Sequence, residues 1–226
     1  MLITIPDVLN AQQLAHCRAL LQTADWTDGR VSAGHQGRRV KDNAQLPEGS
    51  KAAAQLGELV LSALECNPLF ISAALPSVVY PPMFNRYLGG QHFGAHIDNA
   101  VRLLPGSGRK LRTDISATLF LSEPDDYDGG ELLIEDTYGT HSAKLPAGHM
   151  LVYPSTSLHK VEPVTRGARI ASFFWVQSMV RDDGQRTLLF DMDSAIQQLG
   201  RSGAEADALV RLTGSYHNLL RMWAET

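Results

Sequence analysis

The sequence predicts a mainly β fold that is preceded and followed by helices. The hydrophobic period changes from helical to strand-like at about residue 77 and returns to helical after Asp183. Between these points, turn signals such as LGG, YDGG and LPAG separate short apolar runs. Eight short strands at this spacing are typical of an antiparallel barrel or a double-stranded jelly roll.

The region before these strands predicts one short strand and two helices. Residues 2–5, LITI, have the composition of a strand. Asn10 can cap a helix that runs to about residue 22, because its side chain can accept from free N–H groups of the first turn. A second amphipathic helix is predicted over residues 51–66. The apolar face of the first helix consists of Leu14, Cys17 and Leu21.

The chain divides into three predicted regions. These are an N-terminal helical support region at 1–76, a jelly-roll core at 77–180 and a C-terminal helical subdomain at 181–226. The predicted strands of the core are 77–88, 92–97, 113–122, 130–136, 140–145, 149–154, 157–164 and 168–180. Two amphipathic helices are predicted at 185–200 and 202–225. We expect these helices either to pack on the core or to mediate contact between subunits of a homo-oligomer.

Composition excludes several classes of protein. Hydrophobic residues make up 44% of the 226 residues and charged residues 19%, which is enough apolar material for a core and argues against disorder. A net charge of −4 disfavours nucleic acid as the main partner. The most apolar window, residues 57–76, is interrupted by two glutamates and a proline, so we expect no membrane span. MLITIPDVLN lacks the pattern of a signal peptide, and we expect a cytoplasmic protein.

The two cysteines lie in apolar helical patterns and not in CxxC spacing. Cys17 and Cys66 are therefore predicted to be buried free thiols in a reducing compartment.

A histidine and an aspartate stand two residues apart in GAHIDNA, residues 94–100. On a strand, His96 and Asp98 would point to the same face, where an imidazole and a carboxylate can bind a divalent metal. A third ligand is then needed, and the best candidate is His159, 63 residues further on. Two histidines and one carboxylate leave positions open on an octahedral Fe(II) for a co-substrate and O₂. The alternative for His96 alone is an ordinary surface or capping histidine.

Arg169 lies in an apolar run, RIASFFWV, that predicts burial, and a buried arginine needs an anionic partner. If 157–180 forms a hairpin that turns near TRG, Arg169 and His159 are separated by about 13 Å along the sheet. A five-carbon dicarboxylate bound to the metal could then reach Arg169. Tyr87 could bind the same carboxylate. The alternatives are a salt-bridged surface arginine and a core tyrosine.

Three stretches together resemble a known family: FNRYLGGQHFGAHIDNA, TLFLSEPDDYDGGELLIED and LPAGHMLVYPSTSLHKVEPVTRGARIASFFWVQS. They are similar to Fe(II)- and 2-oxoglutarate-dependent dioxygenases of the prolyl 4-hydroxylase-like group. More narrowly, the chain resembles bacterial PKHD-type hydroxylases, the group that includes the PiuC iron-uptake-associated proteins. The resemblance covers nearly the whole chain.

The resemblance implies a double-stranded β-helix in which His96, Asp98 and His159 bind Fe(II). Arg169, helped by Tyr87, would bind the distal carboxylate of 2-oxoglutarate. O₂ would be the oxidant, and hydroxylation would release succinate and CO₂. Relatives often use L-ascorbate to restore oxidised iron, and a link to iron uptake is implied as well.

Two questions stay open from the sequence. The substrate is a small molecule or a peptidyl residue, and a non-catalytic jelly-roll protein that binds or senses iron or a small ligand is the alternative function. The charged segment VRLLPGSGRKLRTD, residues 101–114, is a mobile lid for an anionic substrate or a solvated loop. Its basic residues are Arg102, Arg109, Lys110 and Arg112.

Overall fold

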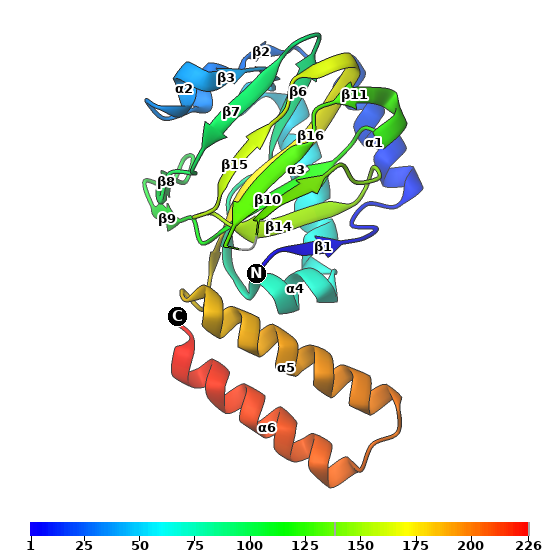
Figure 1. The fold of residues 1–226 in the computed structure, drawn as a ribbon, viewed down its shortest axis with the longest axis vertical. Helices are drawn as coiled ribbons and strands as arrows, with labels where there is room; N and C mark the ends of the chain where they lie inside the picture. Colours follow the sequence, from blue (N-terminus) through cyan, green and yellow to red (C-terminus); the bar gives the residue numbers. More distant parts are fainter. Residues whose placement is uncertain (138, 226) are drawn as a thin grey trace.

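A computed structural model describes residues 1–137 and 139–225, and its centre is a pair of facing antiparallel sheets (Figure 1). In the described residues, the major sheet has nine strands and the minor sheet five. The path of the major sheet is β1 (Ile3–Ile5), β14 (Met150–Pro154), β10 (Ile115–Phe120), β16 (Val164–Ser178), β6 (Met83–Leu88), β4 (Ala44–Gln45) and β2 (Thr27–Asp28), with β5 (Pro76–Val79) and β11 (Tyr127–Gly129) also paired to β16. The minor sheet runs β13 (Gly139–Ala143), β12 (Leu132–Asp136), β15 (Leu158–Val161), β7 (His92–His96) and β3 (Lys41–Asp42). The predicted mainly β jelly roll is confirmed.

Helices cover the outer face of the major sheet (Figure 1). They are α1 (Ala11–Gln22), α3 (Lys51–Glu65) and α4 (Pro68–Ala74). As predicted, Asn10 caps α1: its side chain accepts from the Gln13 N–H at 2.9 Å, and the Gln13 side chain accepts from the Asn10 N–H at 2.9 Å. The helix α4 was not predicted, although Asn67 followed by proline is a helix-start signal.

Two apolar clusters fill the barrel region. The larger lies between the helices and the major sheet and includes Leu14, Leu56 and Phe174. The second lies between the two sheets and includes Tyr87, Phe120 and Leu132. Because this second cluster occupies only part of the space between the sheets, the remainder is available for a cavity.

Two predictions about strands were wrong, and one hairpin was not predicted. Pro81 and Pro82 cannot donate to a ladder, and the predicted strand 77–88 is divided there into β5 and β6. The segment after Asp98 contains a hairpin of β8 (Val101–Leu103) and β9 (Lys110–Arg112). The hairpin expected to join His159 to Arg169 does not exist, because β15 pairs with β7 and β12, whereas β16 pairs in the other sheet. The chain crosses from one sheet to the other between them.

The N-terminal region supplies strands as well as helices. The strand β1 pairs with β14 of the major sheet, and β3 pairs with β7 of the minor sheet. Short helical turns accompany them: η1 (Gly29–Ser32), α2 (Gly37–Val40) and, later in the chain, η2 (Pro124–Asp126). Cys17 is buried as predicted, but Cys66 is exposed, because it is the C-terminal cap of α3 and lies beyond the last buried turn.

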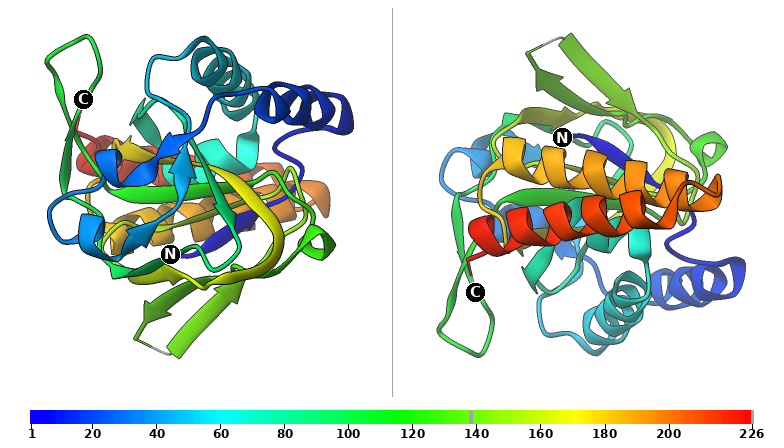
Figure 2. Two further views of the ribbon diagram at one scale, coloured as in Figure 1. Left: turned by 90° about the horizontal axis from the view of Figure 1, so that it is seen from above. Right: turned by 90° about the horizontal axis from the view of Figure 1, so that it is seen from below.

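The C-terminal helices α5 (Asp183–Arg201) and α6 (Ala206–Trp223) form an antiparallel pair below the sheets (Figures 1 and 2). Leu189 of α5 packs with Leu75 and Val180, and α6 adds partly buried residues to this cluster. On the same helix, Leu188 is 60% exposed and Leu199 is also exposed, since the contact face is centred on Leu189. Self-association through these helices stays a prediction.

Among the described residues, no single helix is long and apolar enough to cross a membrane. Only α3 and α4 taken together meet that criterion by length and composition, and they are bent by 85°.

Candidate active site

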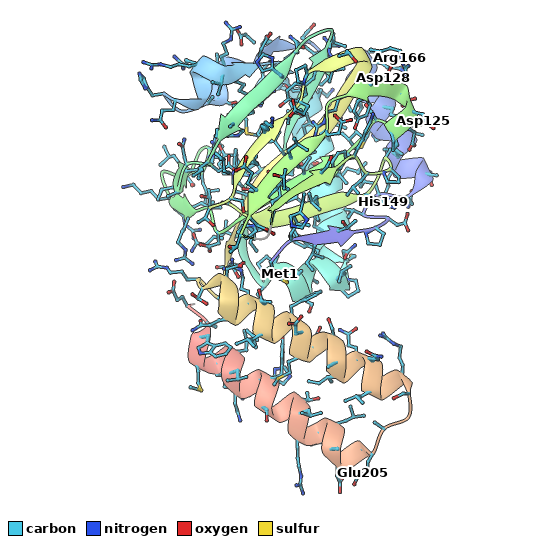
Figure 3. The ribbon with its side chains drawn as sticks, viewed as in Figure 1. Met1, Asp125, Asp128, His149, Arg166 and Glu205 are labelled. Atoms are coloured by element: carbon cyan, nitrogen blue, oxygen red, sulfur yellow. The ribbon has the colours of Figure 1, made fainter. Side chains whose placement is uncertain are left out.

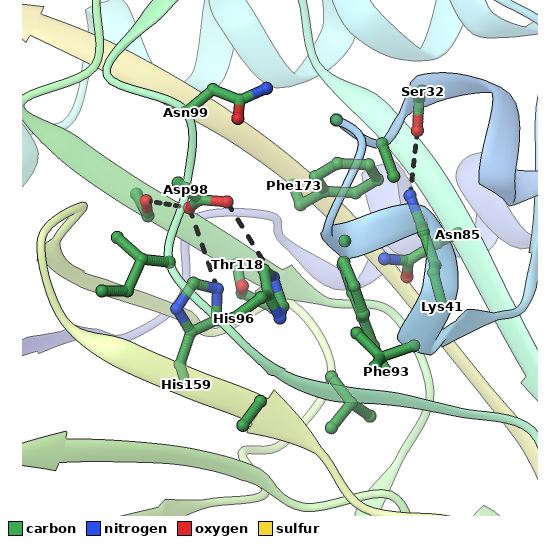
Figure 4. A pocket seen from close by; sticks show the side chains of 18 of the residues that line it. Ser32, Lys41, Asn85, Phe93, His96, Asp98, Asn99, Thr118, His159 and Phe173 are labelled. Carbon is green, nitrogen blue, oxygen red and sulfur yellow. Dashed lines mark hydrogen bonds and ion pairs between the residues drawn. The ribbon is translucent and has the colours of Figure 1, made fainter.

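The two histidines and the aspartate predicted as metal ligands lie together at one end of the space between the sheets (Figure 4). His96 ends β7, and His159 of β15 is its directly paired neighbour in the minor sheet. Asp98 follows two residues after His96, and its carboxylate is 4.0 Å from His96 Nε2 and 3.8 Å from His159 Nε2. One ligand atom from each residue lies within 4.8 Å of the others. Sheet pairing therefore joins residues that are far apart in the sequence.

Backbone carbonyls fix the orientation of both imidazoles. His96 Nδ1 lies 2.8 Å from the Gly94 carbonyl oxygen, and His159 Nδ1 lies 3.0 Å from that of Ser157. A carbonyl can only accept, so each Nδ1 carries the proton and each Nε2 offers a lone pair to the cluster. Burial and, to a smaller extent, the neighbouring His159 lower the pKa of His96 to about 4. His96 is therefore neutral at pH 7, which is the state that binds a metal.

This donor set fits a divalent metal of intermediate hardness. It has two neutral imidazole nitrogens and one carboxylate, held on one side of a cavity. Three protein ligands leave coordination positions facing the cavity, unlike a closed structural site.

Ser116 of β10 fixes the carboxylate, a role that the sequence analysis missed. Its hydroxyl donates to Asp98 Oδ2 at 2.5 Å and lies 2.8 Å from Ser155 Oγ.

We expect Ser116→Ala to weaken Fe(II) binding by about 10- to 100-fold, because an unanchored carboxylate is a poorer ligand. Anaerobic Fe(II) titration measures this. Ser172→Ala is the control, since the buried Ser172 hydroxyl has no hydrogen-bond partner within the described part of the chain. Equal Fe(II) affinity in the two variants would contradict a positioning role for Ser116.

Arg169 is a buried cation whose charge is not neutralised by a carboxylate. It is 1% exposed on β16, and in residues 1–137 and 139–225 no carboxylate lies within 4.0 Å of its guanidinium. Its Nε also lacks a hydrogen-bond partner among those residues. Tyr87 of β6 is its directly paired neighbour, and the guanidinium carbon is 5.4 Å from the Tyr87 ring centre. A buried cation of this kind requires an anionic ligand.

Tyr153 of β14 contacts His159 of the metal cluster, and its role in the site was not predicted. Its ring packs edge-on against His159, with 5.2 Å between ring centres. Burial raises the pKa of Tyr153, and Asp98 and Arg169 are both close enough to affect that pKa. Burial likewise raises the pKa of Tyr87, while Arg169 opposes that shift. Both phenols are therefore neutral hydrogen-bond donors at pH 7.

The cluster, Arg169 and Tyr87 line one cavity of about 700 Å³. That volume is within the range of small-molecule sites. Arg166, three residues before Arg169, is exposed and pairs with Asp128 at 2.7 Å (Figure 3). In the β8–β9 hairpin, Arg102 lines the cavity, whereas Arg109 and Lys110 are exposed and do not.

A jelly roll that holds two histidines and a carboxylate beside a buried arginine has the architecture of an open, catalytic metal site. Solved structures with this fold include a prolyl hydroxylase from Trichoplax adhaerens in complex with a hypoxia inducible factor peptide fragment. That structure has a TM-score of 0.55 and 18% identity, and the match covers 83% of this chain and 86% of the other. A Pseudomonas putida prolyl-4-hydroxylase has a TM-score of 0.50 and 21% identity, with 78% and 92% covered. These likenesses establish the fold.

Sequence comparison identifies the family. Residues 82–177 match the 2OG-Fe(II) oxygenase superfamily, and residues 183–225 match the PKHD-type hydroxylase C-terminal domain. PKHD-type hydroxylases of Paraburkholderia phymatum and Cupriavidus metallidurans are 61% and 64% identical to this chain, with 100% of each chain covered. The chain belongs to the PKHD-type hydroxylases of the 2OG-Fe(II) oxygenase superfamily and is an enzyme. This family uses Fe(II), 2-oxoglutarate and O₂.

Proposed function

We propose that His96, Asp98 and His159 bind Fe(II) and that Arg169, with Tyr87, binds the distal carboxylate of 2-oxoglutarate. The observation that supports this most strongly is the presence, in one cavity, of an open three-ligand cluster and a buried arginine that has no carboxylate partner among the described residues. When bound, iron with 2-oxoglutarate and O₂ supplies the oxidising power to hydroxylate a substrate C–H bond, and succinate and CO₂ are released.

The residues of the chain contribute binding and orientation. Arg169 offers a planar, permanently charged fork that matches a carboxylate, and its burial strengthens that interaction. Tyr87 can donate a phenolic hydrogen bond to the same group. Asp98, anchored by Ser116, supplies negative charge to the cation, and the two histidines supply neutral nitrogen ligands.

A non-catalytic iron-binding or ligand-sensing protein accounts less well for Arg169, because a simple metal site needs no buried dicarboxylate anchor. Our proposal includes a small-molecule or peptidyl substrate, since the prolyl hydroxylase from Trichoplax adhaerens has been solved with a peptide. We also propose a cytoplasmic location, on the composition of the N-terminal sequence and the interrupted apolar window. A link to iron uptake and re-reduction of iron by ascorbate rest on the sequence resemblance.

Anaerobic titration with Fe(II) and then 2-oxoglutarate tests the proposed function. We expect a weak visible metal-to-ligand charge-transfer band that saturates at one 2-oxoglutarate per iron, and succinate formation when O₂ is admitted. Iron binding without such a band or succinate would contradict the enzyme proposal and favour a binding protein.

A further inference from the structure

A second cation, Lys41 of β3, is buried in the wall of the same cavity. It is 4% exposed, and its Nζ donates to Ser32 Oγ and to Gln45 Oε1, both at 2.9 Å (Figure 4). Both acceptors are uncharged, so they do not neutralise the ammonium group. An ammonium has three N–H donors, and these two bonds leave one for a ligand.

A third cation, Arg102 of β8, also lines the cavity. Its guanidinium carbon lies 4.0 Å from the ring centre of Trp175 and 5.0 Å from that of Tyr80. Its Nε is buried and has no hydrogen-bond partner among the residues that the structure describes. Within those residues, no carboxylate lies within 4.0 Å of Arg102 or of the Lys41 ammonium. Two cations in one wall therefore lack a salt-bridge partner in the described part of the chain.

Aromatic side chains connect the two cations. Lys41 Nζ is 5.6 Å from the Phe173 ring centre, which in turn is 5.7 Å from that of Trp175, the ring beneath Arg102. Burial and, to a smaller extent, the charge of Arg102 lower the pKa of Lys41 to about 8, as expected for neighbouring cations. Like charges are costly when desolvated together, so an anion between them would stabilise both.

This pair lies away from Arg169. The residues Arg169, Phe173 and Trp175 point to the same face of β16, since they are separated by even numbers of positions. Phe173 is about 13 Å from Arg169 along the strand, and Trp175 is about 20 Å away. The rings beside which the two cations lie are therefore displaced along the cavity wall from Arg169.

We propose that Lys41 and Arg102 form a carboxylate-binding subsite for the substrate that is hydroxylated. Phe93, Phe173 and Trp175 flank the subsite, so the substrate would combine a carboxylate with an adjacent apolar group. Anchoring the carboxylate between the two cations would hold the apolar part beside the metal cluster, which lines the same cavity. This inference rests on the proposed function and specifies its substrate class.

The test uses 4-fluorobenzoate and its uncharged counterpart 4-fluorobenzamide as probes. The protein is loaded with Zn(II) and saturating 2-oxoglutarate, a complex without turnover, and binding is followed by fluorine NMR. We expect wild type to bind the benzoate at least about ten-fold more tightly than the benzamide, as for a charge-assisted hydrogen bond. Lys41→Met and Arg102→Met should each lose that preference, and Arg102→Lys should keep part of it. Benzamide binding should be the same in all variants.

Arg109→Met and Lys110→Met are the matched controls, because these cations belong to the same hairpin region but are exposed and do not line the cavity. Both should bind the benzoate as wild type does. If Lys41→Met does not fold, Arg102→Met, which changes a hairpin outside the two main sheets, still decides the question.

Three results would overturn the subsite: equal binding of benzoate and benzamide by wild type, competition of benzoate with 2-oxoglutarate, or unchanged preference in both methionine variants. The charge-transfer band of the iron-loaded protein separates these results from failure of the proposed function. A wild-type band together with any of the three refutes the subsite alone, whereas loss of the band in wild type refutes both.

A second probe pair identifies the source of the carboxylate. N-acetyl-4-fluorophenylalanine carries a free carboxylate, and a blocked peptide with adjacent glutamate and 4-fluorophenylalanine carries a peptidyl one. Binding of either that weakens in Arg102→Met supports the subsite, and binding that is insensitive to Arg102→Met contradicts it.

Discussion

His159→Ala is expected to abolish detectable 2-oxoglutarate turnover and to weaken Fe(II) binding by more than about 100-fold. Loss of a residue that only orients a ligand already costs about 10- to 100-fold in metal affinity, and His159 is one of the three proposed ligands. The remaining pair, His96 and Asp98, would leave a metal with mostly water ligands. The charge-transfer band should be absent at iron concentrations that saturate wild type.

His141→Ala is the matched control for this experiment. His141 lies on β13, in the same sheet as His159, and contacts Asp136 at 2.7 Å on an exposed surface. Its removal should change neither Fe(II) affinity nor the band. A His159→Ala protein that still shows the wild-type band, with its fold intact by circular dichroism, would exclude His159 from the metal site.

The metal cluster was largely predictable from sequence because its signal is local. The spacing of His96 and Asp98 fixes a shared face, and a strand-like segment carries His159. The direct pairing of His159 with His96 was not predictable, because partners in a sheet are chosen by packing far along the chain.

The prediction for Arg169 was right about burial and wrong about the path of the chain. Apolar neighbours on both sides of Arg169 indicated a buried strand, and the structure confirms it. The turn signal TRG is equally compatible with a hairpin and with a crossover between facing sheets. The predicted hairpin was therefore wrong. Arg169 consequently faces the site from the opposite sheet to His159.

Lys41 had no sequence signal at all. It stands in VKDNAQLP, where the charged and polar residues Asp42 and Asn43 follow it, a pattern that predicts an exposed loop. Lys41 becomes buried because β3 pairs with the edge of β7, directly opposite Phe93. Cys66 shows the reverse case, since its helical periodicity continues past the end of α3 and does not reveal where the helix stops.

Arg169→Met is expected to raise the 2-oxoglutarate concentration needed for half-saturation at least about 30-fold, equivalent to roughly 2 kcal/mol. The change removes the charge but keeps a long apolar side chain. In the protein without 2-oxoglutarate, the free energy of unfolding should not fall, because a buried cation without a carboxylate partner is replaced by a residue that packs. Anaerobic titration of the charge-transfer band and denaturant unfolding measure the two effects.

The combination of weaker 2-oxoglutarate binding and undiminished stability distinguishes a ligand-binding arginine from a structural one. A structural arginine would lose stability when replaced, and its effect on 2-oxoglutarate would follow from partial unfolding. Arg166→Met is the control on the same strand, since its exposed pair with Asp128 contributes little and lies outside the cavity. Should Arg169→Met bind 2-oxoglutarate as tightly as Arg166→Met does, the buried charge would have to serve another anion, and Lys41 and Arg102 would become the cations to test for the co-substrate.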